Sequence, residues 1–266
     1  MEKYNLPPKP KNTTYKNIKN SIIAILVIAM YIWTFLSIDI EWGRAINRAA
    51  NNFQRVIPKL FSPDWSAVGD VSMSMLETVF IAFAGSLMAA VIAVPLSFLA
   101  ARNMMGGVVL STVGKWILSA IRAFPDIILA ILFVVAVGPN AFAGVLAIAI
   151  GSTGMLGKMF SEIIESIDMN IIEAMEASGA NKIQILFYGV IPQITPEFLS
   201  YAIYRFEVDI RASSILGIVG AGGIGTMIIF ASNNRNWSEM GTILLAIIIV
   251  VTIIDFASSR IRRKII

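Results

Sequence analysis

The sequence contains no cysteine and no histidine, and only 14% of its 266 residues are charged. Without cysteine the chain has no disulfide and no thiol nucleophile, and without histidine it has neither a Ser-His-Asp triad nor the usual zinc ligands. A soluble domain carries about 25% charged residues, whereas 57% of this chain is hydrophobic. So few charges cannot cover a water-facing surface. We therefore expect an all-α, polytopic membrane protein.

Long stretches without charge predict where the chain crosses the membrane, because a helix needs about 20 mostly apolar residues to cross the hydrocarbon. We expect six spans, at about Ser21–Ile38, Leu76–Ala101, Gly114–Val137, Ala141–Gly157, Gln193–Leu216 and Glu239–Ser258. Gly138, Pro139 and Asn140 predict a tight turn between the third and fourth spans. The first twenty residues are polar and basic, and the first apolar run is too long for a signal core, so we expect no cleavable signal peptide.

The distribution of basic residues predicts the orientation. If both termini are cytoplasmic, 13 of the 21 Lys and Arg residues lie inside and five outside, in agreement with the positive-inside rule. The basic residues then set orientation and are not a nucleic-acid footprint. We expect a cytoplasmic segment at 1–20, a first span with an outer amphipathic segment at 21–70, a core transmembrane domain at 71–258 and a basic cytoplasmic tail at 259–266. The longest inner connection, about 158–192, lies within the core.

A glycine-rich stretch, LGIVGAGGIG at 216–225, has the G-x-G-x-x-G spacing of a dinucleotide loop. That motif needs a preceding strand and a soluble βαβ unit, which this composition excludes. The predicted topology places the stretch at the outer end of the fifth span. Its glycines, Gly220, Gly222, Gly223 and Gly225, are interpreted as close helix packing or a broken, re-entrant turn, with a moving gate element as the alternative.

The outer segment from Trp42 to Leu60 repeats apolar residues at helical spacing, with its basic residues on other faces. This pattern is typical of an amphipathic helix lying in the outer interface. A brace on the membrane surface and a docking surface for an external partner both remain open.

The inner connection between the fourth and fifth spans predicts a helix, a turn and a second helix. The fourth helix is expected to continue into the cytoplasm. Gly179 suits a helix stop, and Pro192 suits the first turn of the helix that returns to the membrane. By itself this is a loop, and with a cytoplasmic partner it becomes a docking element.

The same residues resemble the EAA motif of ABC importer permeases. Glu173, Ala174, Gly179 and Pro192 match its spacing, while Met175 replaces the second Ala and Ile191 stands where Leu usually precedes the Pro. In that family the motif forms the coupling helix, which sits in a cleft of the ATP-hydrolysing subunit. The resemblance implies a type I importer permease fold and assigns ATPase coupling to these six residues.

A narrower resemblance, from about Leu76 to Phe256, is to phosphonate importer permeases. It rests on the stretches RAFPDIILAILFVVAVGPNAFAGVLAIAI, GKMFSEIIESID and YRFEVDIRASSILGIVGAGGIG. It implies a subunit that is not itself an enzyme, in a prokaryotic cell membrane, carrying a phosphonate or a related oxyanion such as phosphite or a phosphate ester. The implied partners are a second permease copy (identical or paralogous), two ATPase subunits that bind ATP–Mg, and an external substrate-binding protein. The chain has no G-x-x-x-x-G-K-[ST] loop and no metal or cofactor motif of its own.

Charged residues within the predicted spans are costly, at about 2.5 to 3.5 kcal/mol each on insertion scales. In the fifth span, Arg205 with Asp209 and Glu207 with Arg211 form two i,i+4 pairs of opposite sign on nearly opposite faces, and Arg122 with Asp126 repeats the arrangement in the third span. Either these pairs only make the helices tolerable, or they line the substrate path, where Arg205 and Arg211 would attract an anion. The remaining alternatives for the chain are an ABC permease for another solute such as methionine, or an ATPase-independent secondary transporter or channel.

Overall fold

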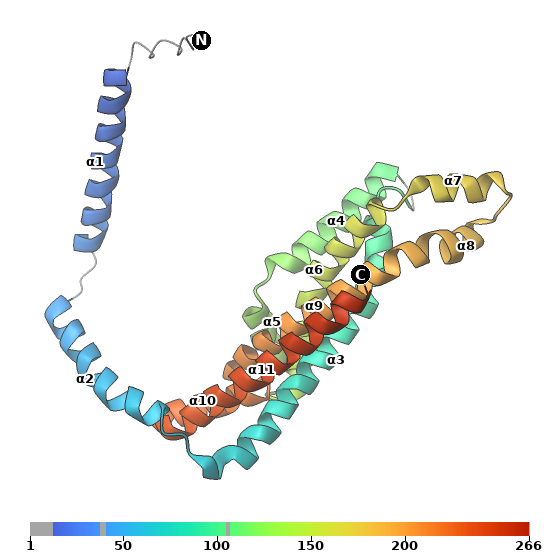
Figure 1. The fold of residues 1–266 in the computed structure, drawn as a ribbon. Coiled ribbons are helices and arrows are strands. Elements are labelled where there is room, and N and C mark those ends of the chain that lie inside the picture. Colours follow the sequence, from blue (N-terminus) through green and yellow to red (C-terminus); the bar gives the residue numbers. More distant parts are fainter. Residues whose placement is uncertain (1–12, 38–40, 105–106, 266) are drawn as a thin grey trace, which may run out of the picture. The chain divides into compact units, whose positions relative to one another are not determined.

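The computed structural model describes residues 13–37, 41–104 and 107–265. Helices and turns make up these residues, and no strand occurs in the described ranges (Figure 1). The chain divides into two compact units, Met1–Arg55 and Val56–Ile266. The all-helical prediction is therefore confirmed, and each unit is described separately.

The first unit contains α1 (Thr13–Ser37) and most of α2 (Trp42–Leu60). Helix α1 is long and apolar enough to cross a membrane, as expected for the first span, although Ile38 lies outside the described residues. Most of the segment 1–20 lies outside them too. Helix α2 is continuous, in agreement with the helical spacing of its apolar residues.

The second unit is a bundle arranged around one long helix, α3 (Val68–Ala100), which follows a short 3₁₀-helix, η1 (Trp65–Ala67). Its other elements, in chain order, are α4 (Gly107–Ala123), α5 (Asp126–Val137), α6 (Ala141–Glu165), α7 (Met169–Ala177), α8 (Lys182–Gln184), the π-helix η2 (Ile185–Val190), α9 (Ile191–Leu216), the 3₁₀-helix η3 (Gly217–Val219), α10 (Ile224–Asn233) and α11 (Trp237–Ile265). Helix α3 packs most extensively on α6 and also contacts α9, α4 and α11.

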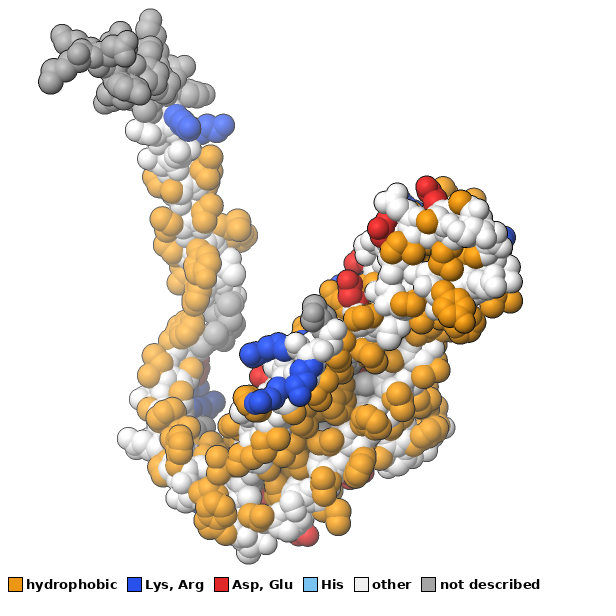
Figure 2. Space-filling view, turned by 45° about the vertical axis from the view of Figure 1, so that its right-hand side comes forward, with side chains coloured by type: hydrophobic (Ala, Val, Ile, Leu, Met, Phe, Trp, Pro, Cys, Tyr) orange, Lys and Arg blue, Asp and Glu red, His pale blue; other side chains and the backbone are white. Residues whose placement is uncertain are grey.

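Small residues bring α3 and α6 together. Ala82, Ala89 and Ala93 on α3 are fully buried, and a Cβ added to Gly85 would lie 2.7 Å from the Ile148 side chain of α6. Close approach through small residues is typical of helix packing in membranes. On the outside of the bundle, hydrophobic side chains cover most of the face seen in Figure 2. Both features fit a membrane-embedded bundle.

The number of spans agrees with the sequence. In the described residues four helices are long and apolar enough to cross a membrane, or up to six if each of two bent pairs counts as one span. The third predicted span is one of these bent pairs. Helices α4 and α5 meet at 80° because Pro125 has no N–H to donate and disfavours helical geometry in the preceding residue. The predicted third span is therefore bent at Pro125.

Helices α6 and α11 extend further than the fourth and sixth predicted spans. Helix α6 continues to Glu165, eight residues beyond Gly157. The expected extension of the fourth helix past its predicted span is therefore confirmed. Helix α11 runs from Trp237 to Ile265, beyond the predicted sixth span at both ends. The predicted turn before α6 is confirmed: Gly138 has φ +87°, and the Asn140 side chain caps the helix through the N–H of Ala143 at 3.1 Å.

Candidate functional site

The segment between α6 and α9 forms an arm that extends past the end of α11 (Figure 1). Helix α7 ends at Gly179, whose φ of +81° is left-handed. The N–H of Ala180 donates to the carbonyl of Met175 at 3.0 Å, and the N–H of Gly179 donates to that of Glu176 at 2.9 Å. This pair of bonds is a Schellman motif. The helix stop predicted at Gly179 is confirmed.

The return helix begins earlier than the sequence suggested. Asn181 and Gln184 form a capping box, in which each side chain accepts from the other residue's backbone N–H at 2.9 and 2.8 Å. From there α8, η2 and α9 form one continuous helical segment. Pro192 lies in the first turn of α9 as expected, but it follows the π-helix and does not start a new helix. The Pro is tolerated because the π-helix changes the hydrogen-bond register just before it.

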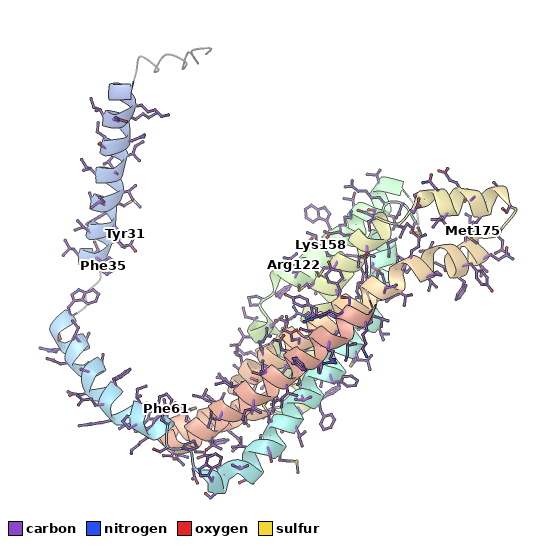
Figure 3. The ribbon with its side chains drawn as sticks, in the orientation of Figure 1. Tyr31, Phe35, Phe61, Arg122, Lys158 and Met175 are labelled. Carbon is purple, nitrogen blue, oxygen red and sulfur yellow. The ribbon has the colours of Figure 1, made fainter. Side chains whose placement is uncertain are left out.

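The EAA-like residues divide into an exposed and a packed set. Glu173 and Ala174 are exposed, so they are available to another protein. Met175 is half-buried and points back into the arm (Figure 3), where it packs against the hydrophobic cluster containing Ile172 and Ile185. The departure from Ala at this position therefore fills space inside the arm itself. The exposed face of the motif is not changed by it.

The pair Arg205–Asp209 in α9 lies inside the bundle. Arg205 donates through Nε to Asp209 Oδ1 at 2.9 Å, and the Asp209 side chain is fully buried. Asp209 also accepts from the hydroxyls of Ser86 in α3 at 2.7 Å and Ser152 in α6 at 2.8 Å. Asp126 at the start of α5 lies 3.7 Å from Arg205 Nη2. This network, here called the α9 clamp, joins α3, α6 and α9 by charge-assisted hydrogen bonds and reaches α5 through the ion-pair contact with Asp126.

The second pair, Glu207–Arg211, faces a different neighbour. Glu207 is buried and accepts from Arg211 Nη2 at 2.5 Å and from Arg262 Nη2 of α11 at 3.2 Å. Arg262 also stacks on the Tyr204 ring, 5.5 Å from its centroid. The Arg211 side chain is half exposed. The contact places Glu207 level with the basic end of α11, which was predicted to be the cytoplasmic tail.

The pair expected between Arg122 and Asp126 does not form. In the described ranges no carboxylate lies within 4.0 Å of Arg122, and Asp126 lies near Arg205 instead. The cause is the bend at Pro125, which breaks the helical spacing on which an i,i+4 pair depends. Two partners of the clamp, Ser86 and Ser152, were not identified from the sequence, because isolated serines in apolar spans give no signal of their own.

A row of glycines along α6 was also overlooked, although its spacing is visible in the sequence. A Cβ added at Gly151 would collide with the Asp126 carboxylate, and one at Gly154 would lie 3.0 Å from the backbone N of Arg122. A Cβ at Gly157 would lie 2.5 Å from the Leu118 side chain. These glycines therefore let α4 and α5 approach α6 on both sides of the bend.

The glycine-rich stretch forms a break between η3 and α10, where the helical axis turns by 46°. Gly220, Gly222 and Gly223 all have positive φ. A Cβ at Gly217 would lie 2.7 Å from the Cα of Gly225. The predicted broken turn with close packing is confirmed, and its role as a gate stays a prediction.

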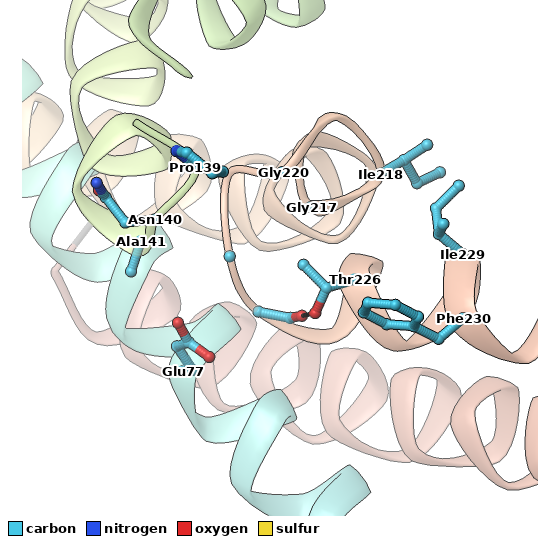
Figure 4. A pocket seen from close by; sticks show the side chains of 12 residues that line it. Glu77, Pro139, Asn140, Ala141, Gly217, Ile218, Gly220, Thr226, Ile229 and Phe230 are labelled. Carbon is cyan, nitrogen blue, oxygen red and sulfur yellow. Dashed lines mark hydrogen bonds between the residues drawn. The ribbon is translucent and has the colours of Figure 1, made fainter. Parts of the chain in front are cut away.

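The glycine turn borders a pocket of about 580 Å³. Figure 4 shows Glu77 of α3 and Thr226 of α10 on its wall, beside the start of α6 at Asn140. Helix α10, which forms part of the pocket wall, lies at the opposite end of the bundle from α7 of the arm (Figure 1). At the start of α10 the N–H of Ile224 donates to the Thr78 hydroxyl of α3 at 2.7 Å.

Comparison with protein families gives a match over residues 93–265, to the family described as "Binding-protein-dependent transport system inner membrane component". The matched range contains the arm, the glycine turn and every member of the α9 clamp except Ser86. It therefore covers every candidate site residue predicted from the sequence.

Individual relatives and solved structures agree. The chain is 39% identical over 201 residues to the phosphite transport system permease protein PtxC of Stutzerimonas stutzeri, covering 76% of this chain and 73% of that protein. It is 33% identical over 219 residues to the phosphate-import permease protein PhnE of Mycolicibacterium smegmatis, covering 82% of this chain and 41% of that protein. An inward-facing structure of the MetNI methionine ABC transporter superposes with a TM-score of 0.66 at 23% identity, covering 76% of this chain and 99% of that one.

Proposed function

Because this chain belongs to the family of binding-protein-dependent transport system inner membrane components, we propose that it is the permease subunit of an ATP-driven importer for a small phosphorus oxyanion. The family match over 93–265 is the observation that carries the proposal. The cargo would be a phosphonate, phosphite or a phosphate ester. The chain would not hydrolyse ATP, since it has no phosphate-binding loop of its own.

The arm supports coupling to an ATPase. It is a rigid hairpin, closed by a Schellman motif and a capping box, and it presents Glu173 and Ala174 to solvent at its far end. In the proposed complex two ATPase subunits would bind ATP–Mg and hold two permease copies, identical or paralogous, by these arms. Closure of the ATPase pair would pull on the arms and turn the bundles from inward-open to outward-open. An external binding protein would then deliver the substrate.

The proposed orientation places both termini and the arm in the cytoplasm, and the glycine turn outside. The positive-inside distribution of Lys and Arg supports it. The structure adds that the arm and the glycine turn lie at opposite ends of the bundle, as a cytoplasmic coupling element and an outer turn require. In a prokaryotic cell membrane the outer turn would then lie on the side from which the binding protein approaches.

Sequence similarity favours a phosphorus oxyanion over methionine. The relative named for phosphite is 39% identical, whereas the methionine transporter structure is 23% identical and supports the fold alone. A secondary transporter remains less well supported, because it would leave the exposed end of the arm without a partner.

The decisive experiment is reconstitution of the chain in liposomes with the ATPase and the binding protein encoded beside it. ATP hydrolysis is measured without ligand and with methylphosphonate, phosphite, phosphate or methionine. Stimulation by phosphite or methylphosphonate supports the proposal. Stimulation by methionine alone would keep the permease and change the cargo, and failure to assemble with the ATPase would refute ATP-driven transport.

A further inference from the structure

Two cations on adjacent helices, one on α4 and one on α6, differ from the arginines that are paired within the bundle. Arg122 and Lys158 are both exposed. Across the described ranges, neither side chain has a hydrogen-bond partner or a carboxylate within 4.0 Å. By contrast Arg205, Arg211 and Arg262 are all paired. Charged side chains in membrane-embedded bundles face a polar cavity or a partner rather than lipid.

The packing of α4 on α6 places these two cations near each other. The Arg122 backbone lies against Gly154, since a Cβ there would be 3.0 Å from the Arg122 N. Lys158 is four residues further along α6 and therefore on the same face. Figure 3 shows Arg122 and Lys158 on these adjacent helices. Glu162 follows Lys158 by another turn, but its carboxylate does not come within 4.0 Å of the Lys158 ammonium.

The acids of the α9 clamp lie beside Arg205 and not beside the two exposed cations. Asp126 is the acid nearest in sequence to Arg122, and it lies beside Arg205. Arg205 Nη1 lies 3.1 Å from the Met155 sulfur of α6. Met155 is three residues before Lys158, so the clamp borders the face of α6 that carries Lys158. Asp126 and Asp209 both lie beside Arg205, and no acid within 4.0 Å offsets Arg122 or Lys158.

We propose that Arg122 and Lys158 are the residues that contact the phosphorus oxyanion on its way through the permease, while Arg205 is a positioning residue held by the clamp. This proposal rests on the function proposed above. A guanidinium binds two oxygens of a phosphonate or phosphite side by side, and an ammonium adds a compact charge. Exposed, unpaired cations bind weakly enough to release the ion again, which transport requires. This proposal differs from the sequence-based hypothesis that Arg205 and Arg211 attract the anion.

The test measures uptake and ATP hydrolysis separately, in proteoliposomes containing the assembled importer and saturating phosphite or methylphosphonate. Arg122→Gln and Lys158→Gln each remove a charge-assisted bond, so we expect the uptake rate to fall about tenfold. ATP hydrolysis stimulated by the binding protein should change by less than about twofold, because the arm is untouched. Arg263→Gln, which removes an exposed cation at the far end of α11, is the matched control and should transport normally.

The absence of native cysteine allows a second test that does not depend on how the glutamine variants fold. Lys158→Cys is treated with a methanethiosulfonate reagent that adds an ammonium group, or with one that adds a sulfonate. The ammonium reagent should restore uptake, and the sulfonate reagent should not. Equal effects of the two reagents would overturn the proposal.

Three further outcomes would also refute the proposal. Normal uptake by both glutamine variants would remove these residues from the path. A parallel fall in uptake and ATP hydrolysis would assign them a role in coupling. Recovery of the variants in vesicles enriched in anionic phospholipid would identify the ligand as a lipid phosphate. If the wild-type importer carries neither phosphite nor methylphosphonate, the proposed function itself fails. If the wild type carries one of them and the variants transport it normally, only the assignment of Arg122 and Lys158 fails.

Discussion

Replacing Asp209 with alanine removes the carboxylate that accepts hydrogen bonds from Ser86, Ser152 and Arg205. The guanidinium of Arg205 then stays buried, with Asp126 at 3.7 Å as its remaining acid. Removing one partner of a buried ion pair costs about 3 to 5 kcal/mol. The Asp126 side chain is 39% exposed, so it recovers at most about 1 kcal/mol of this. We expect Asp209→Ala to lower the free energy of unfolding by about 2 to 5 kcal/mol.

A double variant without either charge separates the effect of charge from that of packing. Arg205→Met together with Asp209→Leu removes both charges and keeps most of the volume, and such replacements are often neutral or stabilising. The two serine hydroxyls can turn to carbonyls of their own helices. The double variant should therefore be more stable than Asp209→Ala by about 2 to 3 kcal/mol.

The assay is denaturant unfolding of the purified chain in detergent, followed by tryptophan fluorescence, with the wild type and three variants measured side by side. Arg263→Gln is the control, because its exposed side chain lies outside the clamp. If the double variant is as unstable as Asp209→Ala, the buried charge is not the cause. The clamp would then stabilise the bundle only through packing.

Three other substitutions test the arm, the α6 glycines and the contact with α11. A Cβ added at Gly179 would have open space around it, but the backbone has a φ of +81°. Gly179→Ala should therefore cost about 1 to 2 kcal/mol of local strain and reduce ATP hydrolysis in the assembled complex. Full activity would show that the left-handed turn is dispensable. Gly154→Ala should lower stability by about 1 to 3 kcal/mol in thermal unfolding, since its Cβ would meet the backbone of α4. The control is Gly69→Ala, which has nothing within 4 Å of its added Cβ and should leave the unfolding midpoint unchanged. Glu207→Gln should cost about 1 to 3 kcal/mol by weakening the bonds from Arg262 and Arg211, and an unchanged unfolding midpoint would contradict a structural role for this contact.

Composition and the pattern of apolar runs were enough to predict that the chain is a membrane-embedded helical protein. Few charges and long apolar runs leave no other way to satisfy the backbone in lipid, and this signal is local. The end of α7 at Gly179 and the turn before α6 were also predictable, because each depends on the conformational freedom or the capping group of one or two residues. The arm was predictable too, because the EAA-like motif is a spacing of residue types within one short stretch of the chain.

Which charged residues pair with one another depends on how the helices pack. Helical spacing correctly paired Arg205 with Asp209, but it could not supply Ser86 and Ser152, which are 123 and 57 residues away along the chain from Asp209. It wrongly paired Arg122 with Asp126, because an 80° bend at Pro125 carries the two onto different helices. A periodic pattern gives the face of a straight helix, whereas the partner across that face depends on how bent helices pack. In this protein the glycines of α6 set that packing, and so they determine which cations remain exposed.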